Sequence, residues 1–225
     1  MRFTKMATVF AIGAMLIFVP ATAATSKKKA VTTTTRKAAK AIVPAPIVLQ
    51  GTGEIVSDAV TLAKGTITTA MTHDGSSNFQ VELVDPNTGK AVAFLANEIG
   101  PWTGTNVDEL SASGKYLVQV AADGAWTIRI EHPRPTTGLS LPQKFSGHGE
   151  AIAGVLAYTG GAKFTMSHNG TSNFQVDGFD PASGRDLFLA NEIGQWSGSK
   201  VAPLKGIRII HVKADGDWTI TVSKA

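Results

Sequence analysis

The same seven residues, Phe-Leu-Ala-Asn-Glu-Ile-Gly, occur at 94–100 and at 188–194, and after one intervening residue each copy has a tryptophan. Each copy therefore brings an amide, a carboxylate and an indole together. An indole can stack on a sugar ring while amide and carboxylate groups bond to its hydroxyls. The pattern indicates a carbohydrate contact site, and its candidate residues are Asn97, Glu98, Trp102, Asn191, Glu192 and Trp196.

A structural interpretation accounts for the same residues. In this interpretation a strand ends at Leu95, residues 97–100 turn the chain, and Ile99 and Trp102 plug the open end of the fold. Asn97 and Glu98 would then bond to loop amides that otherwise lack partners. An indole in a glycine-bounded loop suits either role, so the sequence leaves both open.

Catalysis has less support in the sequence. Glu98 and Glu192 are one loop carboxylate per copy, whereas glycoside hydrolysis needs two carboxylates that face each other across a cleft. A hydrolase built from both copies would require carboxylates of both to meet in one pocket. The chain has no cysteine and no Gly-x-Ser-x-Gly nucleophile motif, so we expect a protein that is not an enzyme.

The histidines and acidic residues do not indicate a metal site or a cofactor. His73 is followed by Asp74, but its counterpart His168 is followed by Asn169, so a base with its orienting carboxylate is not repeated. We expect these histidines to stabilise turns. No His-x-x-x-His pair and no Asp-rich calcium loop is present, and we expect no metal and no cofactor.

The N-terminus is typical of a secretory signal peptide at residues 1–23. Basic Arg2 and Lys5 precede an apolar run over 6–19, and Ala21-Thr22-Ala23 is a cleavage site of small residues. The alternative is a retained anchor, but the run is shorter than the ~20 residues that a spanning helix needs. We expect a protein that is secreted or held in the cell envelope.

The next segment, 24–46, is rich in Lys, Thr and Ala and predicts a disordered linker. Its six basic residues have no acidic counterpart within the segment, and the remaining chain is net acidic. Such an arm suits attraction to anionic envelope polymers or lipid headgroups, or serves only as a solubilising tether. It lacks interleaved aromatic residues, so we expect no nucleic-acid partner, and membrane contact only through the signal peptide or this linker.

Beyond the linker the chain is a tandem repeat. Residues 47–134 match 141–225, and the offset falls from 96 to 92 residues between the first and the last matched pairs, which indicates small deletions in loops. A short proline-containing segment joins the copies and predicts a restricted relative orientation. We refer to 47–134 as the first repeat and to 141–225 as the second repeat.

Within each repeat apolar residues alternate with polar ones, which is the period of half-buried strands. This alternation places Trp126 and Trp218 in the core, after Asp-Gly pairs that favour two-residue hairpin turns. Strands at roughly ten-residue spacing, without amphipathic helices, are typical of sandwiches. The predicted fold is all-β, with two tandem antiparallel β-sandwich domains of jelly-roll type.

A family resemblance rests on the glycine-led first strand, on "LAKG" at 62–65, on "SNFQVELVDPNTG" at 77–89 and on "ASGKYLVQVAADGAWTIRI" at 112–130. This layout, present in both repeats, resembles the pre-peptidase C-terminal (PPC) type of secreted bacterial β-sandwich. The resemblance implies a non-catalytic module that accompanies secreted enzymes and in some cases binds matrix or polysaccharide. The Asn-Glu-Ile-Gly-x-Trp-x-Gly block is not part of the resemblance.

Together these observations favour an exported, non-catalytic binding or adhesion module at the cell surface, whose partner is a polysaccharide or another envelope polymer. The main alternative is a structural envelope component that binds no small ligand and assembles through strand edges. The least supported alternative is the hydrolase that uses carboxylates of both repeats.

Overall fold

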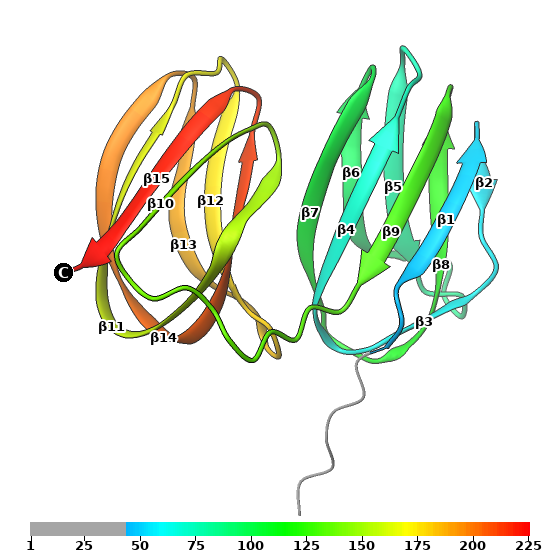
Figure 1. Cartoon of the computed structure of the whole chain (residues 1–225). Coiled ribbons are helices and arrows are strands. Elements are labelled where there is room, and N and C mark those ends of the chain that lie inside the picture. The colour runs from blue at the N-terminus through cyan, green and yellow to red at the C-terminus, as the bar shows by residue number, and fades with distance from the viewer. Residues whose placement is uncertain (1–43) are drawn as a thin grey trace, which may run out of the picture. The chain divides into compact units, whose positions relative to one another are not determined.

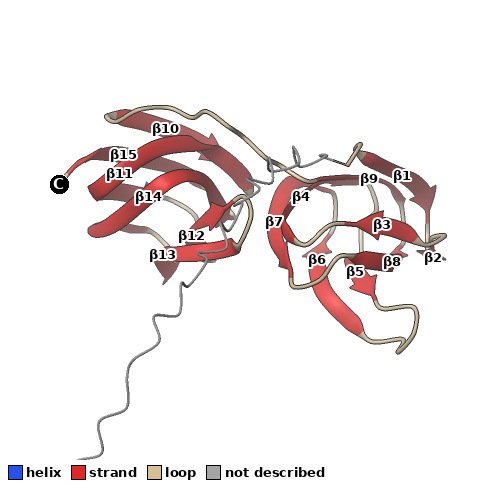
Figure 2. Ribbon diagram, turned by 90° about the horizontal axis from the view of Figure 1, so that it is seen from below, coloured by secondary structure: helices blue, strands red, loops and turns tan. Residues whose placement is uncertain are grey.

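The part of the chain that the structure describes, residues 44–225, is built from β-strands and contains no helix (Figure 2). The predicted all-β fold class is confirmed in this computed structural model. The predicted signal peptide lies outside the described residues. So does the predicted linker, except for Pro44, Ala45 and Pro46, which precede the first strand.

The first repeat contains nine strands. They are β1 (Ile47–Thr52), β2 (Ile55–Val56), β3 (Val60–Leu62), β4 (Gly65–His73), β5 (Asn78–Val84), β6 (Ala91–Ile99), β7 (Trp102–Leu110), β8 (Gly114–Ala122) and β9 (Ala125–Glu131). The second repeat contains six. They are β10 (Gln143–His148), β11 (Ala151–His168), β12 (Asn173–Asp180), β13 (Gly184–Ile193), β14 (Trp196–Ala214) and β15 (Asp217–Lys224).

The first repeat is a sandwich of two antiparallel sheets. One sheet has the strand order β1-β9-β4-β7, and the other has the order β2-β8-β5-β6, with β3 also paired to β8. Figure 1 shows the two layers, with β1, β9, β4 and β7 in front of β8, β5 and β6. The strands β1, β7 and β6 are edges of their sheets.

The second repeat forms the same two layers from one continuous sheet, in the order β10-β15-β11-β14-β12-β13. The two long strands β11 and β14 pair from end to end and pass from one layer into the other. They bend at Gly160 (φ 140°) and Gly206 (φ 78°), a left-handed region that favours glycine. The first repeat has two extra residues between β7 and β8, which explains part of the drift in offset.

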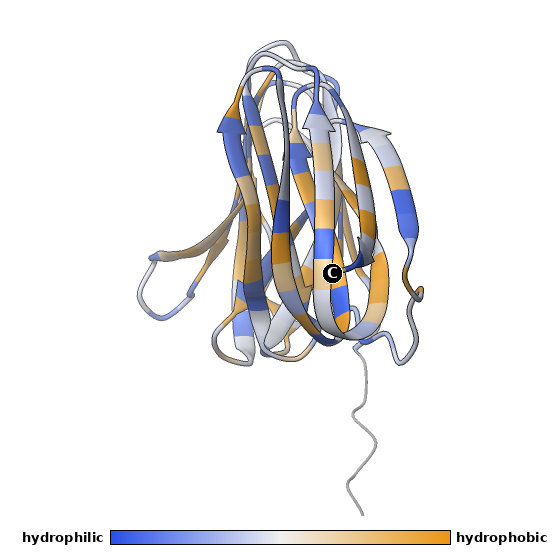
Figure 3. Ribbon diagram, turned by 90° about the vertical axis from the view of Figure 1, so that its left-hand side faces the viewer, coloured by the Kyte–Doolittle hydropathy of each residue, from blue (hydrophilic) through white to orange (hydrophobic). Residues whose placement is uncertain are grey.

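Each repeat has its own hydrophobic core, built by the predicted alternation. Hydrophobic and hydrophilic residues alternate along the strands in Figure 3. Trp126 and Trp218 are 4% and 3% exposed, as the alternation predicts. Each indole covers a glycine directly opposite on the neighbouring strand, Gly51 or Gly147, where a side chain would collide with the ring.

The Asp-Gly and Asn-Gly pairs do not form the predicted hairpin turns. The strands on either side, such as β4 and β5 or β8 and β9, belong to different sheets and do not pair. Neither Gly75 nor Gly124 has a positive φ. Glycine is required there by space instead: a side chain at Gly75 would collide with Asp123, and one at Gly124 would collide with the backbone of Gly75.

A buried histidine ties three crossover turns together at this end of the first repeat. His73 is 4% exposed, stacks on Phe79 with ring centroids 4.7 Å apart, and its Nδ1 lies 3.0 Å from the carbonyl oxygen of Gly100. Its Nε2 lies 3.3 Å from Oδ1 of Asp123. The other oxygen of Asp123 accepts hydrogen bonds from the backbone N–H groups of Ser76 and Ser77.

The second repeat contains the same arrangement. His168 stacks on Phe174, and its ring nitrogens lie 3.1 Å from the carbonyl oxygen of Gly194 and 3.1 Å from Asp215. Asp215 accepts hydrogen bonds from the backbone N–H groups of Thr171 and Ser172. The expectation that these histidines stabilise turns is confirmed, because each joins turns that are distant in the sequence.

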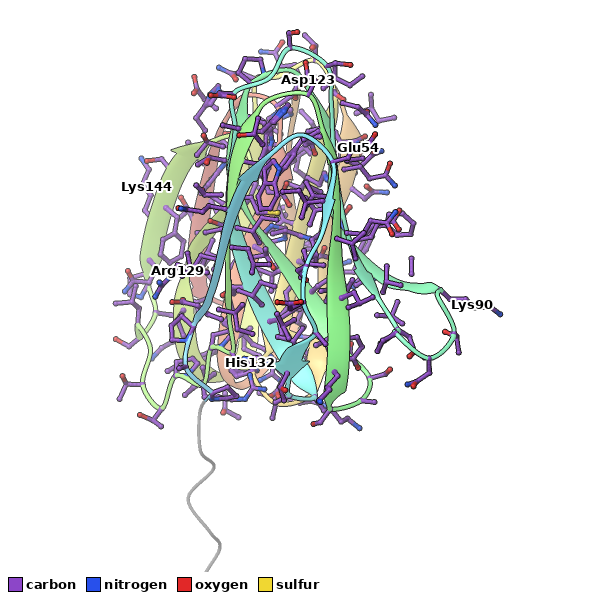
Figure 4. The ribbon with its side chains drawn as sticks, turned by 90° about the vertical axis from the view of Figure 1, so that its right-hand side faces the viewer. Glu54, Lys90, Asp123, Arg129, His132 and Lys144 are labelled. Carbon is purple, nitrogen blue, oxygen red and sulfur yellow. The ribbon has the colours of Figure 1, made fainter. Side chains whose placement is uncertain are left out.

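The segment that leaves β9 is fixed at the opposite end of the first repeat. Figure 4 shows Asp123 and His132 at opposite ends. Nε2 of His132 accepts the N–H of Ala63 (2.9 Å), which requires a neutral ring. Burial, and then the charge of Arg134, lower the pKa of His132 and keep it neutral. Arg134 donates to the carbonyl oxygens of Thr66 and Lys64 at 2.9 Å.

The two repeats touch within one compact unit that includes all described residues. The edge strand β7 of the first repeat lies against the outer sheet face of the second. Val107 of β7 packs with Phe179 and Ile209 in a third apolar cluster. Thr105 donates its N–H to the carbonyl oxygen of Glu150 (3.2 Å), and its own carbonyl oxygen lies 3.1 Å from Nε2 of His211.

We predict that acid weakens the fold through the two histidine-bound aspartates. Desolvation acts to raise the pKa of Asp123 and of Asp215, but the hydrogen bonds that each carboxylate accepts from the turn between β4 and β5, or between β11 and β12, outweigh it and lower both pKa values. A lowered pKa stabilises the fold above the unfolded value of about 3.9, and this stabilisation is lost as pH falls through the folded value. The double variant D123N/D215N should therefore have a lower free energy of unfolding at neutral pH and a smaller loss on acidification.

Urea unfolding at a series of pH values measures this dependence. D58N is the control, because Asp58 is exposed and bonds only through its backbone oxygen. Equal acid sensitivity of the wild type and the double variant would contradict the assignment.

Candidate functional site

The repeated heptad belongs mostly to a strand in both repeats. Its first six residues lie in β6 and in β13, which end at Ile99 and Ile193. The expectation that the chain turns from Asn97 onward is therefore wrong, because Asn97 and Glu98 still pair with β5. The turn begins at Gly100, whose φ of 85° is one that residues with a side chain rarely adopt.

The fold uses only some of the repeated residues. Leu95 and Ala96 are both buried, because an irregularity in the pairing of β5 and β6 turns two consecutive residues inward. The strand presents the other side chains to solvent, and the most exposed apolar ones are Ile99 and Ile193, at 83% and 80%. The exposed residue types are the same in both repeats, and they are Phe94, Asn97, Ile99, Phe188, Asn191 and Ile193.

Trp102 and Trp196 are half-buried and pack against the cores of their repeats. Their rings lie 6.2 Å from Phe79 and 5.9 Å from Phe174, measured between centroids. A side chain on the glycine two residues later would collide with each indole, which explains the Trp-x-Gly spacing. The indoles thus pack against the end of each core and remain partly accessible at the surface.

The two sets of candidate residues have different surroundings. In the first repeat Asn97, Glu98 and Trp102 line a cavity of 380 Å³ together with residues of the second repeat, including Lys213. Nζ of Lys213 lies 3.4 Å from Oε1 of Glu98. The candidate residues of the second repeat do not line that cavity. Asn191 is exposed and Glu192 is half-buried on β13.

Trp196 borders a separate depression of 430 Å³ within the second repeat, beside Asn169, Gln195 and Asp217. Asp217 is engaged there already. Its carboxylate accepts a hydrogen bond from Nδ2 of Asn169 (3.1 Å) and pairs with His148 (2.9 Å). The sequence therefore predicted one kind of site twice, whereas the structure gathers the three candidates of the first repeat around one cavity and places only Trp196 of the second set beside the other hollow.

A third cavity, of 280 Å³, lies between the repeats, where β6 and β7 meet β12, β13 and the C-terminal half of β14. We call it the inter-repeat cleft. Its lining is mixed, because the rings of Phe94 and Phe179 lie among hydrogen-bonding side chains. The polar residues that line it include Asn97, Asn106, Asp108, Gln175, Asp177 and Arg185.

Asp177 is the most unusual residue of the cleft. It is 2% exposed, and its Oδ1 is buried without a hydrogen-bond partner. Oδ2 accepts a hydrogen bond from Nε2 of Gln175 (2.5 Å) and lies 3.5 Å from Nη1 of Arg185. A buried carboxylate oxygen without a donor is costly, so this atom calls for a donor from a group that enters the cleft.

Asp108 faces the same cleft from the first repeat. Burial raises the pKa of its carboxyl, against the hydrogen bonds from Glu109 and Asn106 and the charges of His211 and Arg185. Nδ2 of Asn106 holds Oδ2 of Asp108 at 3.3 Å and also donates to the carbonyl oxygen of Leu95. The cleft thus contains a carboxyl whose pKa is raised by burial and a carboxylate with one oxygen, Oδ1 of Asp177, that has no hydrogen-bond partner.

A buried charge network supports one wall of the cleft. His211 is 5% exposed, and its Nε2 lies 3.2 Å from Oε1 of Glu150, which is itself 8% exposed. The same nitrogen lies near the carbonyl oxygen of Thr105, so it links the second repeat to β7. Lys213 lies 3.8 Å from the other oxygen of Glu150.

The sequence did not indicate this cleft. Comparing the repeats draws attention to residues that both retain, whereas Asp108 corresponds to Ala202 and Asp177 to Glu82. Asp177 occupies a polar position of the alternation along β12, so the pattern predicts an exposed side chain there and gives no local signal of a buried carboxylate. A sequence pattern within one repeat cannot predict a cavity that exists only where the two repeats touch.

Among residues 44–225, no group of three or more His, Cys, Asp and Glu side chains is placed to hold a metal ion. Within the same range no helix is long and apolar enough to cross a membrane.

We predict that D108N stabilises the protein at neutral pH. Because the pKa of Asp108 is raised in the folded state, ionisation costs the folded protein more than the unfolded chain, and stability is lost as pH rises. The neutral asparagine avoids this cost. The gain should vanish at pH values below about 4, where the carboxyl is protonated in both states.

Thermal and urea unfolding of the wild type and D108N at neutral and acidic pH provide the comparison. E109Q is the control, because Glu109 is the exposed neighbour of Asp108. A loss of stability in D108N at neutral pH would mean that Arg185 and His211 outweigh burial.

In the comparisons with known proteins, no protein-family model and no curated protein matches the chain. A proposal for its function therefore has to rest on the cleft and on the surfaces of the two repeats.

Proposed function

We propose that the protein is an exported, non-catalytic binding module and that the inter-repeat cleft holds a saccharide unit of an envelope or extracellular polymer. The unpartnered buried oxygen of Asp177 is the observation on which this proposal rests. A sugar hydroxyl would donate to it and restore the missing hydrogen bond.

The other lining groups suit the same ligand class. Gln175 and Arg185 supply donors, and the Asn97 amide can donate and accept, which matches hydroxyls that do both. The ring of Phe94, which is 60% exposed, offers an apolar face beside these polar groups. A cavity of 280 Å³ is at the lower end of ligand-pocket sizes of about 300 to 1,000 Å³, which favours one sugar residue or a chain end.

A binding role agrees with the other sequence-based expectations. The predicted signal peptide and basic linker would place the folded repeats outside the cell, next to anionic polymers. A non-catalytic role is also what the resemblance to the PPC type implies. The exposed Phe, Asn and Ile residues on β6 and β13 give a polymer further contact area in both repeats.

We predict that D177N weakens saccharide binding by about tenfold or more, which corresponds to about 1.4 kcal/mol. The amide keeps the shape of the carboxylate but has only one acceptor oxygen and no charge. R185A should also weaken binding, and Arg185 is exposed enough that its removal should not affect folding. Glycan arrays identify the ligand, and titration calorimetry with that glycan measures the effect.

E82Q is the matched control, because Glu82 has the register of Asp177 in the first repeat and also accepts a hydrogen bond from a glutamine two residues earlier. It should bind as the wild type does. Binding that survives D177N but is lost in W196F would move the site to the depression beside Trp196. No binding to any glycan would favour the structural envelope component.

A glycoside hydrolase is the second candidate, because the cleft meets the condition that carboxylates of both repeats share one pocket. Asp108, with its raised pKa, would be the acid, and Asp177 would supply the second carboxyl group. Incubation of the wild type and D108N with any glycan that binds separates the two functions. Release of reducing ends that stops in D108N would establish hydrolysis, whereas equal binding without release supports the module.

A further inference from the structure

The contact between the repeats joins two different surfaces. The first repeat contributes the edge strand β7, and the second contributes the outer face of β11, β12 and β14. Such a contact is heterologous, and every heterologous contact leaves the complementary surface unused on each partner. Because the repeats share a fold, the second repeat retains an unused edge and the first an unused face.

The unused edge is the part of β14 that corresponds to β7. From Trp196 to Arg208 this strand pairs only with β11, so its other side is open. Val201 corresponds to Val107, since each follows its repeat's tryptophan by five residues. Val107 is 4% exposed in the contact, whereas Val201 is 61% exposed.

The backbone of this edge is also in the required register. Thr105, which bonds to the second repeat through its N–H and carbonyl groups, pairs with Ala70 of β4. Ser199 pairs with Thr165, the residue that corresponds to Ala70. The N–H and carbonyl groups of Ser199 therefore point outward, as those of Thr105 do.

The unused face is formed by β2 and β8. Val56 stands opposite Gln119, as Ile152 stands opposite His211 in the second repeat. Ile152 packs against the apolar cluster of the contact, whereas Val56 is 57% exposed. Glu54 corresponds to Glu150, whose carbonyl oxygen receives the bond from Thr105, and Figure 4 shows the side chain of Glu54 at the surface.

The unused edge and the unused face can make the same kinds of hydrogen bonds and apolar contacts with each other as the two repeats make within one molecule. The N–H of Ser199 can donate to the carbonyl oxygen of Glu54, and the side-chain amide of Gln119 can donate to the carbonyl oxygen of Ser199. Val201 then meets Val56 and Leu117, which is half-buried. Each group reproduces the role of its counterpart between the repeats.

The differences between the repeats set the strength of the new contact. Ala121 stands at the position of Lys213, so the new contact has no counterpart of the ion pair between Lys213 and Glu98. Gln119 stands at the position of His211 and carries no charge. Pro203 has no N–H, but the backbone bonds of this contact use residue 199 and not 203. Association should therefore be modest and depend little on salt.

From these correspondences we infer that the protein associates head to tail with further copies of itself, through the β14 edge of one copy and the β2 and β8 face of the next. Because the two surfaces are different, the assembly is open-ended unless its rotation closes a ring. This inference does not depend on the proposed saccharide site.

We predict that the purified protein shows a mass that rises steadily with concentration in sedimentation equilibrium, beyond that of a dimer. V201D should weaken the association by at least about tenfold, because the contact would bury an unpaired carboxylate. V48D is the matched control, since Val48 is equally exposed, at 60%, and lies on the edge strand β1. It should associate as the wild type does.

Mixing two variants tests the direction of the contact. V56D disables the face and leaves the edge intact, whereas V201D disables the opposite surface, so each alone should be monomeric. Mixed together they should form heterodimers and nothing larger. A wild-type protein that is monomeric at all concentrations would overturn the inference, and so would equal effects of V48D and V201D or a mixture that stays monomeric.

Discussion

The seating of the β7 edge on the second repeat is the contact on which the rest of the structure depends. It buries Val107 against Phe179 and Ile209 and satisfies both backbone groups of Thr105. Without it, the outer sheet face of the second repeat would expose apolar and charged residues to water together. The inter-repeat cleft is the space that this contact leaves unfilled beside it, so the cleft exists only because the repeats are held in one arrangement.

Inside each repeat, the corresponding constraint is the buried imidazole. The chain has no cysteine, so no disulfide can join the crossover turns at the end of the sandwich. His73 and His168 do this in the same way. Nδ1 of each ring lies within hydrogen-bond distance of a carbonyl oxygen in one turn, and Nε2 lies beside an aspartate of a second turn, whose other oxygen accepts hydrogen bonds from a third. Since the turns meet around one ring, glycine is needed where they approach most closely, and the same glycines recur in both repeats.

Much of the fold could be predicted because each strand faces one core. A period of two is a property of a single segment, and it placed Trp126, Phe79 and their counterparts correctly. The turns were predicted less well, because Asp-Gly pairs favour hairpins only when the flanking strands pair with each other. Here the flanking strands do not pair with each other in either repeat, and that depends on the whole topology and not on the turn.

The candidate site shows a different limit. Comparing two repeats reveals what the fold requires of both, and Leu95, Gly100 and the tryptophans belong to that set. A site that forms once, between the repeats, needs residues that differ between them. Asp108 corresponds to Ala202 of the second repeat, and Asp177 corresponds to Glu82 of the first. The positions that diverged are therefore the better guide to a function of the pair.

The same divergence separates the cleft from the assembly. A contact between copies that repeats the internal one would bring Ala202 and Pro203 of one molecule beside Glu82 and Ala91 of the next. The corresponding residues of the cleft are, in the same order, Asp108, Glu109, Asp177 and Arg185. That junction would have no counterpart of Asp108 and no arginine beside the carboxylate of Glu82. Each molecule would then supply one polar cleft however many copies associate, and the junctions between copies would serve only to join them.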